Sequence, residues 1–425
     1  MTVHAPPPAP ETIEQSAVGQ RLLVDLVLKL IHVEGLNTAS ALSARSRLPI
    51  ALISELLDEL RQLALLEPLG THGRDFAAEL LYALTSKGQD WAMAALERSQ
   101  YIGPAPVSLE AFRAQVEKQR LAGEPVGPEQ LMRSFRQLVL PEDLLTRLGP
   151  AVNSGKSMLL YGASGNGKTA IAEALREAFQ DVIAVPYCIA VDGQIINYFD
   201  AHVHQALPDR STDGSGLRTG AIRDRRWVAC RRPVSVVGGE LTLEMLDLVF
   251  DPATRFYEAP SHLKATGGVF LIDDFGRQRA SPESILNRWI VPLERGVDYL
   301  SLRTGKKFPV PFDGLVIFST NLKPTDVADP GMLRRLHYKI EVTEPSRDDY
   351  ARIWSLVCVE RGIELPEGML DFLEEQLYMR HSVTRAGYHP RYLVDQVSAI
   401  CEYEGQPLRL DRDRLSLAWR NLFTG

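Results

Sequence analysis

The spacing of hydrophobic positions changes along the chain, and each change predicts a different kind of structure. Up to about residue 102, apolar residues mostly recur at helical spacing, as Leu22, Leu26 and Ile31 do. From Leu138 onward, short apolar runs alternate with helical stretches, which is typical of a parallel sheet with crossover helices. From about Thr343 to the end the spacing is helical only. The order predicts a helical unit, then an α/β unit, then a second helical unit.

Residues 13–102 predict three helices, two short strands and a closing helix. Gly35 and Asn37 end the first helix, and Pro49 stands in the first turn of the third. The expected elements are helices at 17–33, from Thr38, and at Pro49–Leu63, strands at Leu66–Leu69 and Leu80–Leu84 around a polar turn at 70–75, and a helix at Gln89–Ser99. This order and the stretch Tyr82–Ala92 resemble a winged helix-turn-helix.

Apolar runs predict the strands of the α/β unit. They lie at Ser157–Tyr161, Val182–Tyr187, Gly268–Ile272 and Leu315–Ser319. The expected organisation of the whole chain is a disordered tail at 1–12, a winged-helix-like domain at 13–102, a linker with one helix at 103–135, an α/β nucleotide-binding domain at 136–342 and a helical lid at 343–425.

The segment Leu159–Thr169 carries the strongest chemical signal. It reads G-x-x-x-x-G-K-T at Gly162, Gly167, Lys168 and Thr169, with an apolar strand before it and a helix after it. Glycines let backbone N–H groups surround phosphates, and the helix N-terminus adds its positive end. Lys168 is expected to reach the β- and γ-phosphates and Thr169 to ligate Mg²⁺. The expected nucleotide-binding residues are Gly162, Ala163, Ser164, Gly165, Asn166, Gly167, Lys168, Thr169 and Ala170.

A second signal follows about 100 residues later, where the apolar strand Gly267–Ile272 ends in Asp273 and Asp274. An acid in this position predicts a Walker B motif, so Asp273 is expected to hold Mg²⁺ and Asp274 to orient or deprotonate the attacking water. The expected cofactors are therefore ATP and Mg²⁺, with Thr169 and Asp273 as metal ligands.

These two motifs together resemble the AAA+ ATPase superfamily. The usual Walker B of that superfamily ends in Asp-Glu, whereas this chain has Asp274, one methylene shorter. The resemblance implies an AAA+ core with a parallel sheet and a C-terminal helical lid, preceded here by the small winged helix-turn-helix domain.

Three further segments resemble other parts of that superfamily, in the same order. Leu315–Asn321 resembles the sensor 1 strand, so Asn321 is expected between Walker A and Walker B, where it helps to position water. Asp329–Ile340 resembles the arginine-finger segment, with Arg335 as the finger and Arg334 as the alternative. His389–Val394 resembles sensor 2, with Arg391 reaching the γ-phosphate from the lid. The resemblance thus implies catalytic roles for Asp274, Asn321, Arg335 and Arg391.

An arginine finger acts on the neighbouring subunit's nucleotide in most of this superfamily. The resemblance therefore implies that the chain is its own partner, in a homo-oligomeric ring with a hexamer as the expected size. A hairpin at Tyr299–Phe312 and the segment Ser261–Asp274 resemble the branch that holds MoxR-like chaperones and enhancer-binding activators.

Composition limits which partners, cysteine chemistry and cellular location are expected for this chain. The net charge is -7, so no overall basic field indicates nucleic acid. The four cysteines are too far apart for a Cys-x-x-Cys pair, which indicates reduced thiols and neither a disulfide framework nor a zinc site. No stretch approaches ~18 uninterrupted apolar residues and the first residues lack a signal-peptide pattern. We expect a cytoplasmic protein without membrane insertion.

Charge also bears on the partner. The expected recognition helix Pro49–Leu63 carries Glu55, Asp58, Glu59 and a single Arg61, and residues 13–102 have a net charge of -3. That favours a protein partner over DNA. Leu207–Arg232, with a local charge of +4, is either a solvated hairpin or a contact for substrate or nucleic acid.

Three functions fit these observations. The first is an ATPase that remodels or regulates a protein partner recruited by the N-terminal domain. The second is a DNA-associated ATPase, resembling a helicase loader or a transcription regulator, that uses the winged helix or the segment 207–232. The third is a nucleotide-gated switch with low turnover, which the intact Lys168, Asp273 and Arg335 argue against.

Overall fold

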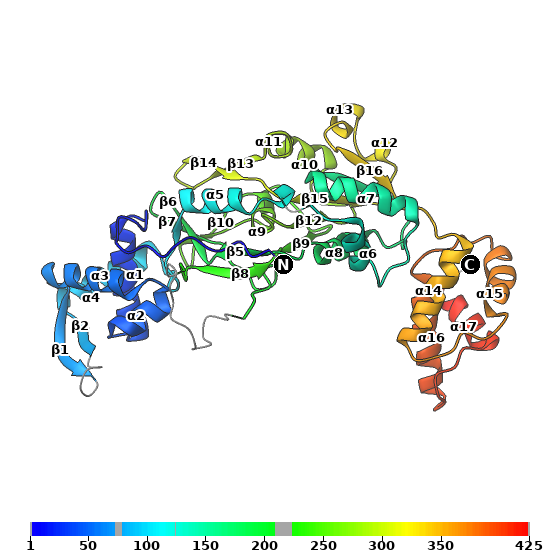
Figure 1. Cartoon of the computed structure of the whole chain (residues 1–425), viewed down its shortest axis with the longest axis horizontal. Coiled ribbons are helices and arrows are strands. Elements are labelled where there is room, and N and C mark those ends of the chain that lie inside the picture. Colours follow the sequence, from blue (N-terminus) through cyan, green and yellow to red (C-terminus); the bar gives the residue numbers. More distant parts are fainter. Residues whose placement is uncertain (1, 73–78, 124, 209–222, 424–425) are drawn as a thin grey trace.

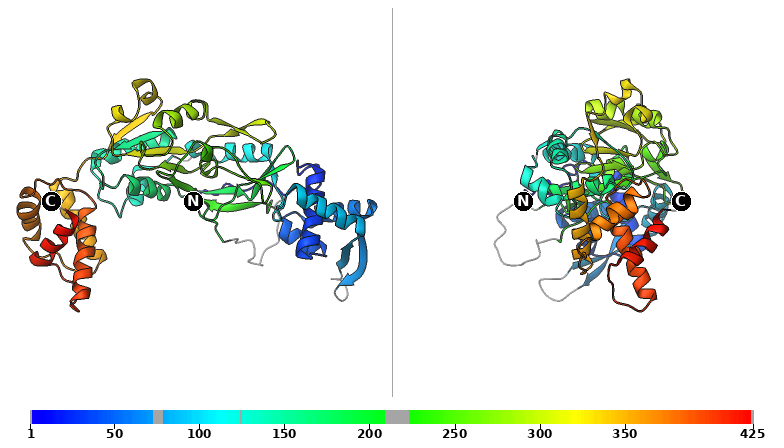
Figure 2. Two further views of the ribbon diagram at one scale, coloured as in Figure 1. Left: turned by 180° about the vertical axis from the view of Figure 1, so that it is seen from behind. Right: turned by 90° about the vertical axis from the view of Figure 1, so that its right-hand side faces the viewer.

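A computed structural model of the chain describes residues 2–72, 79–123, 125–208 and 223–423. Figure 1 shows three parts side by side along the longest axis, and the view from behind in Figure 2 agrees. A helical unit with a long hairpin lies at one end, an α/β part lies in the middle, and a second helical unit lies at the other end. No helix in these described ranges is both long and apolar enough to cross a bilayer.

The N-terminal unit contains the elements that the apolar spacing predicts. They are α1 (Gln20–Glu34), α2 (Ala39–Ser46), α3 (Ile50–Gln62), β1 (Leu66–His72), β2 (Glu79–Leu84) and α4 (Ser86–Arg98). Thr38 and Thr85 cap α2 and α4, since each hydroxyl accepts a backbone N–H of the first turn. The three leading helices and the antiparallel pair β1–β2 enclose a leucine-rich core. Part of the expected turn at 70–75 lies outside the described residues.

A parallel five-stranded sheet forms the centre of the α/β part. Its order is β16 (Tyr338–Glu341), β4 (Met158–Tyr161), β15 (Leu315–Thr320), β12 (Val269–Ile272) and β9 (Val234–Val237). The three inner strands are buried on both faces, which explains why they read as continuous apolar runs.

Helices cover both faces of this sheet. One face packs against α6 (Pro128–Ser134), α7 (Glu142–Ser154) and α8 (Lys168–Ala178). The other packs against α10 (Pro282–Arg288) and α11 (Ile290–Arg295), with Trp289 between them fully buried. Short helices complete this part at α9 (Ser261–Lys264), α12 (Pro324–Val327) and α13 (Pro330–Leu333).

One predicted strand lies outside the parallel sheet. The run Val182–Tyr187 forms β5 (Val182–Pro186), which pairs antiparallel with β8 (Trp227–Arg231). β9 occupies the position beside β12 instead. The prediction of a strand was correct and its placement was wrong, because an apolar run of five residues carries no information about its pairing partner.

Residues 103–135 also differ from the expected linker with one helix. β3 (Val107–Ser108), α5 (Leu109–Lys118), a 3-10 turn (Leu121–Gly123) and α6 are all packed structure, and Phe112 is 1% exposed. β3 joins a second sheet in the order β10 (Val249–Asp251), β11 (Phe256–Glu258), β7 (Gln194–Asn197), β6 (Cys188–Val191) and β3. The Pro and Gly residues that suggested a linker stand at the ends of these short elements.

The hairpin expected before the sensor 1 strand is present. β13 (Val297–Ser301) pairs antiparallel with β14 (Lys307–Pro311) across the turn that contains Gly305. Beyond Thr343 the described residues form helices and no strand, as predicted. These are α14 (Arg347–Glu360), α15 (Met369–Phe372) with its π-helical continuation at Leu373–Met379, α16 (His389–Tyr403) and α17 (Arg412–Leu422), around a core that includes Trp354 and Trp419.

Residues 2–12 are described and make backbone contacts with the α/β part, contrary to the expected disordered tail at 1–12. His4 N donates to Val182 O at 2.9 Å, Val182 N donates to Thr2 O at 3.0 Å, and Asp224 N donates to Pro7 O at 3.0 Å. An extended proline-rich segment has no internal hydrogen bonds, so it can pair with the free edge of a strand. Composition alone did not reveal that β5 has such an edge.

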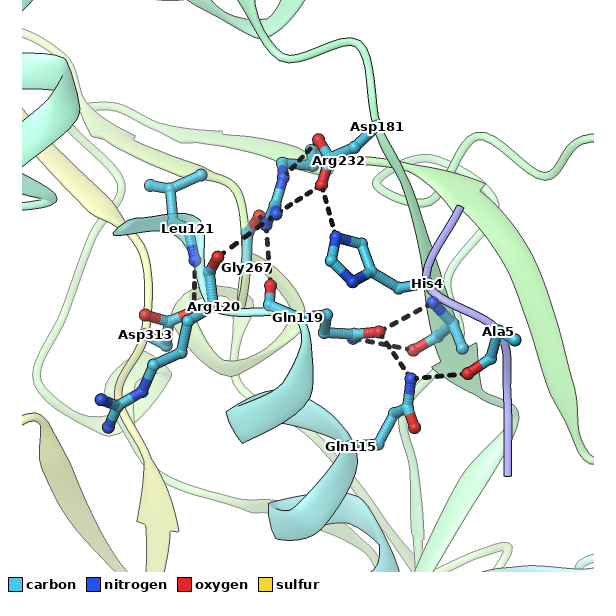
Figure 3. A network of polar contacts seen from close by, with 11 residues as sticks. His4, Ala5, Gln115, Gln119, Arg120, Leu121, Asp181, Arg232, Gly267 and Asp313 are labelled. Atoms are coloured by element: carbon cyan, nitrogen blue, oxygen red, sulfur yellow. Dashed lines mark hydrogen bonds and ion pairs between the residues drawn. The ribbon is translucent and has the colours of Figure 1, made fainter. Parts of the chain in front are cut away.

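A buried ion pair links this segment to the sheet core (Figure 3). Arg232 Nε donates to Asp181 Oδ1 at 2.7 Å, and both residues are almost fully buried. Arg232 also donates to Gln119 O at the end of α5 and to Gly267 O just before β12. His4 Nε2 lies 3.1 Å from the second oxygen of Asp181. The Arg232 guanidinium therefore connects three segments: Asp181, between α8 and β5; the end of α5; and the residue before β12.

We expect Arg232→Met to lower the free energy of unfolding by about 3–5 kcal/mol, because it leaves the buried Asp181 carboxylate without its main partner. Urea unfolding of the full chain measures this. Arg231→Met is the matched control, since Arg231 pairs with Glu177 at 3.5 Å on the surface and its loss should be below about 1 kcal/mol. Equal losses for the two variants would contradict the assigned role.

Candidate functional site

The P-loop connects β4 to α8 at the carboxyl edge of the parallel sheet. Gly162 has φ +143°, and a Cβ there would lie 2.2 Å from Val342 O, at the end of β16. Gly165 has φ +81°, a conformation that residues with a Cβ rarely adopt. Glycine is therefore required at both positions, and the loop can curl back over the start of α8.

Lys168 points into this loop. Its Nζ donates to Gly162 O at 3.0 Å, to Ala163 O at 2.9 Å and to Asn321 Oδ1 at 2.7 Å. Burial lowers the pKa of Lys168, while the nearby carboxylates of Asp273 and Asp274 act in the opposite direction. The ammonium thus occupies the inside of the loop, where a phosphate would meet it.

Thr169 and Asp273 lie together below the loop. Thr169 Oγ1 donates to Asp273 Oδ2 at 2.7 Å, and Asp273 Oδ1 accepts from Asp274 N at 3.0 Å. A hydroxyl and a carboxylate are hard oxygen ligands of the kind that Mg²⁺ prefers, with waters and substrate phosphates completing its shell. These two side chains fit the predicted metal site. The described residues contain no group of three or more His, Cys, Asp and Glu side chains that could hold a metal.

Asn321 connects Lys168 to the second acid. Its carbonyl oxygen Oδ1 accepts the hydrogen bond from Lys168 Nζ, and its Nδ2 donates to Asp274 Oδ1 at 3.2 Å. Asp274 is exposed and has φ +50°, which is uncommon for a residue with a side chain. The structure therefore brings together Lys168, Thr169, Asp273, Asp274 and Asn321 in one hydrogen-bonded set.

Arg335 lies outside this set, just after α13. Its Nε donates to Glu294 Oε1 at 3.2 Å and its Nη1 donates to Gly331 O at 2.9 Å. Its side chain is 22% exposed, whereas Arg334 is an exposed residue. In the described residues the Arg335 side chain binds Glu294 and Gly331 of its own chain. Its role in a neighbouring site stays a prediction.

Arg391 lies in the first turn of α16 and pairs with Glu360 at the end of α14. Nη1 and Nη2 donate to the two carboxylate oxygens at 3.2 and 2.6 Å, and both side chains are 55% exposed. The hydrogen bonds described for Arg391 are thus within the lid, and its reach to a γ-phosphate stays a prediction.

The residues just before α16 touch the P-loop, which sequence reasoning missed. Tyr388 N donates to Gly165 O at 3.0 Å and Gly387 N donates to Asn166 Oδ1 at 3.2 Å. A cavity of about 40 Å³ lies beside this contact, lined in part by Asn166, Gly387, Thr343 and Leu140. The only signal in the sequence was the Gly387-Tyr388 pair directly before the sensor 2 segment.

Part of the positive charge of the basic segment Leu207–Arg232 is paired in the described residues. Arg226 forms a buried pair with Asp224, and Arg232 pairs with Asp181. Trp227 is 6% exposed. Arg210 and Arg218 lie outside the described residues. Among the described arginines, those left at the surface are Arg223, Arg225 and Arg231, and Arg231 pairs with Glu177 at 3.5 Å. Asp181 and Glu177 lie outside the segment, so these two pairs leave less free positive charge than the net +4 of the sequence suggests.

A family model described as a domain of unknown function, DUF8689, matches residues 346–421, which cover the helices of the C-terminal unit. No curated protein matches the chain.

Solved structures similar to this chain include three bacterial proteins. Thermotoga maritima RuvB, described as a Holliday junction branch migration motor, is 14% identical over 70% of this chain and 70% of its own, with a TM-score of 0.36. Domain III of the Thermotoga maritima replication initiation protein DnaA is 13% identical over 71% of this chain and 100% of its own, with a TM-score of 0.37. Brucella abortus NtrX is 13% identical over 69% and 71%, with a TM-score of 0.34.

The strand order of the central sheet bears directly on the fold. The sensor 1 strand β15 lies between the P-loop strand β4 and the Walker B strand β12, as the resemblance requires. A hairpin precedes that strand and a helical unit follows the sheet. The middle part of the chain is thus a parallel P-loop sheet with the strand order that the resemblance to AAA+ ATPases implies, and a helical unit follows it.

We expect Lys168→Ala to weaken ATP binding by about 100-fold, because it removes a charged hydrogen-bond donor from the phosphate loop. Titration with a fluorescent ATP analogue measures the affinity. Lys156→Ala, an exposed lysine just before β4, is the control and should bind like the parent. Parent-like affinity in Lys168→Ala would show that phosphates bind elsewhere.

Proposed function

We propose that this chain binds and hydrolyses ATP with Mg²⁺ in a homo-oligomeric ring and uses the energy to remodel or regulate a protein partner. The observation that supports hydrolysis best is the continuous set of hydrogen bonds from Lys168 through Asn321 to Asp274, beside the Thr169–Asp273 pair. A binding loop alone would need only Lys168 and the glycines.

Each member of this set has a distinct task in the proposal. Lys168 exchanges its loop carbonyls for phosphate oxygens and neutralises their charge. Thr169 and Asp273 would hold Mg²⁺, which supplies charge neutralisation when it is bound. Asp274 accepts a proton from, or orients, the attacking water, and Asn321 fixes the Asp274 carboxylate through Nδ2.

Two arginines complete the proposed site. Arg335 acts on the nucleotide of the neighbouring subunit, and that requirement is the reason for proposing a ring. Arg391 exchanges Glu360 for the γ-phosphate when the lid closes. Both guanidinium groups are at least partly exposed and bound to a carboxylate of their own chain, so each has an anionic partner that a phosphate can replace.

The N-terminal unit, which we propose to be a winged helix, recruits the partner. Its helix α3 presents Glu55 and Asp58 to solvent, and Arg61 pairs with Asp58. Arg45 is bound to Glu34 through Nε and Nη2. Among the described residues of this unit few free cations remain to contact phosphates, and the acids on α3 would repel DNA. These charges favour a protein partner. We place the protein in the cytoplasm, where its four buried thiols would stay reduced.

Substitutions of Asp273 and Asp274 should affect ATP binding and ATP turnover differently. Asp274→Asn should keep ATP·Mg²⁺ binding and lower kcat by about 10²–10⁴-fold, because an amide cannot take the proton of water. Asp273→Asn should weaken Mg²⁺-dependent binding. Phosphate release and nucleotide titration measure the two effects, with the exposed Asp326→Asn as control. Full turnover in Asp274→Asn would show that Asp274 neither takes the proton of the attacking water nor orients that water.

A further inference from the structure

The P-loop and the start of α16 form a direct contact that joins the phosphate site to the lid. Tyr388 N and Gly387 N donate to Gly165 O and Asn166 Oδ1. The Tyr388 ring lies against Gly165, since a Cβ there would be 2.1 Å from Cδ1 of the ring. Glycine at 165 is thus required by the lid as well as by the loop conformation.

The side-chain amide of Asn166 has a hydrogen-bond partner at its oxygen but none, in the described residues, at its nitrogen. Its Oδ1 is bound to the lid, whereas Nδ2 is buried and has no hydrogen-bond partner in the described part of the chain. Buried amide donors are nearly always paired, so an exception in a functional loop calls for an explanation. Asn166 and Gly387 also line the small cavity whose other walls come mainly from residues 139–144 and 341–345. A donor in this position suits an acceptor atom of a ligand in the loop.

The contact bears on Arg391 through the geometry of α16. Gly387 and Tyr388 immediately precede the helix, which begins at His389, and Arg391 lies in its first turn. Because the P-loop holds the residues just before α16, it also fixes where the backbone of the first turn lies, and with it the base of the Arg391 side chain. In this structure Arg391 pairs with Glu360, so placing it on a phosphate requires its side chain to leave Glu360 while the start of α16 stays held.

We propose that Asn166 is a positioning residue that couples the bound nucleotide to the lid. Its Nδ2 donates to an acceptor of the nucleoside triphosphate, while its Oδ1 holds Gly387 and thereby positions Arg391. This inference rests on the proposed function, because it requires ATP in the P-loop. It assigns to the Asn166 side chain a task separate from the backbone N–H groups that surround the phosphates.

Backbone hydrogen exchange of residues 386–392 in the full chain tests this, with and without a saturating non-hydrolysable ATP analogue and Mg²⁺. In the parent, the analogue should slow exchange of the Gly387 and Tyr388 amides by about tenfold or more. In Asn166→Ala the analogue should still bind, yet slow these amides by less than about twofold. Gln396→Ala, whose side chain contacts Asn421 on α17, is the control and should respond like the parent.

Turnover gives a second readout. If Asn166 acts through Arg391, Asn166→Ala should lower kcat more than it raises the Kd for ATP, and adding it to Arg391→Ala should cause no further loss. Asn166→Asp keeps the acceptor for Gly387 and lacks the donor, so it should retain the ligand-free exchange rates and lose the response to the analogue.

Two results would overturn the inference while leaving ATP hydrolysis intact. One is an equal slowing of the Gly387 and Tyr388 amides in Asn166→Ala and the parent. The other is an additive loss in the variant that combines Asn166→Ala with Arg391→Ala. A parent chain that does not bind ATP would contradict the proposed function first and this inference with it.

Discussion

The parallel pairing of β4, β15 and β12 is the constraint on which the rest of the structure depends. Parallel neighbours end at the same edge of a sheet, so the residues that follow each strand meet there. Lys168 comes after β4, Asn321 after β15, and Asp273 and Asp274 after β12. The central position of β15 is what allows Asn321 to contact both Lys168 and Asp274. A different strand order would leave the same residues in the chain and separate them in space.

The two ends of this sheet are stabilised in different ways. The carboxyl edge holds the hydrogen-bonded set around Lys168, which is buried, and Asp274, which is exposed. The opposite edge is fixed by the buried Arg232–Asp181 pair, which also binds carbonyl oxygens of Gln119 and Gly267. A desolvated pair of this kind strongly disfavours partial opening, since either charge left alone would be unpaired in the interior. The region beneath the site is therefore rigid, while the lid touches the site through a few contacts around Gly165.

Sequence alone predicted the parts of this architecture that short patterns encode. The P-loop, the acids after β12, the strand before Asn321 and the hairpin before it each depend on residues within about a dozen positions. The parts that failed depend on distant partners. β5 has the apolar pattern of a central strand but pairs with β8, and the first residues pair with β5. Arg232 and Arg226 read as surface charge because their carboxylates, Asp181 and Asp224, are identified only by the fold. The contact of Tyr388 with Gly165 could not be predicted for the same reason.

The central claim is that each ATP site is completed by a neighbouring copy of the chain. The most direct measurement mixes two variants, one with an intact finger and no working P-loop (Lys168→Ala), the other with an intact P-loop and no finger (Arg335→Ala). The account predicts that each is inactive alone and that the mixture recovers ATP hydrolysis, because an Arg335→Ala site can receive Arg335 from a Lys168→Ala neighbour. A mixture as inactive as its components, or an Arg335→Ala chain with full turnover on its own, would contradict the account.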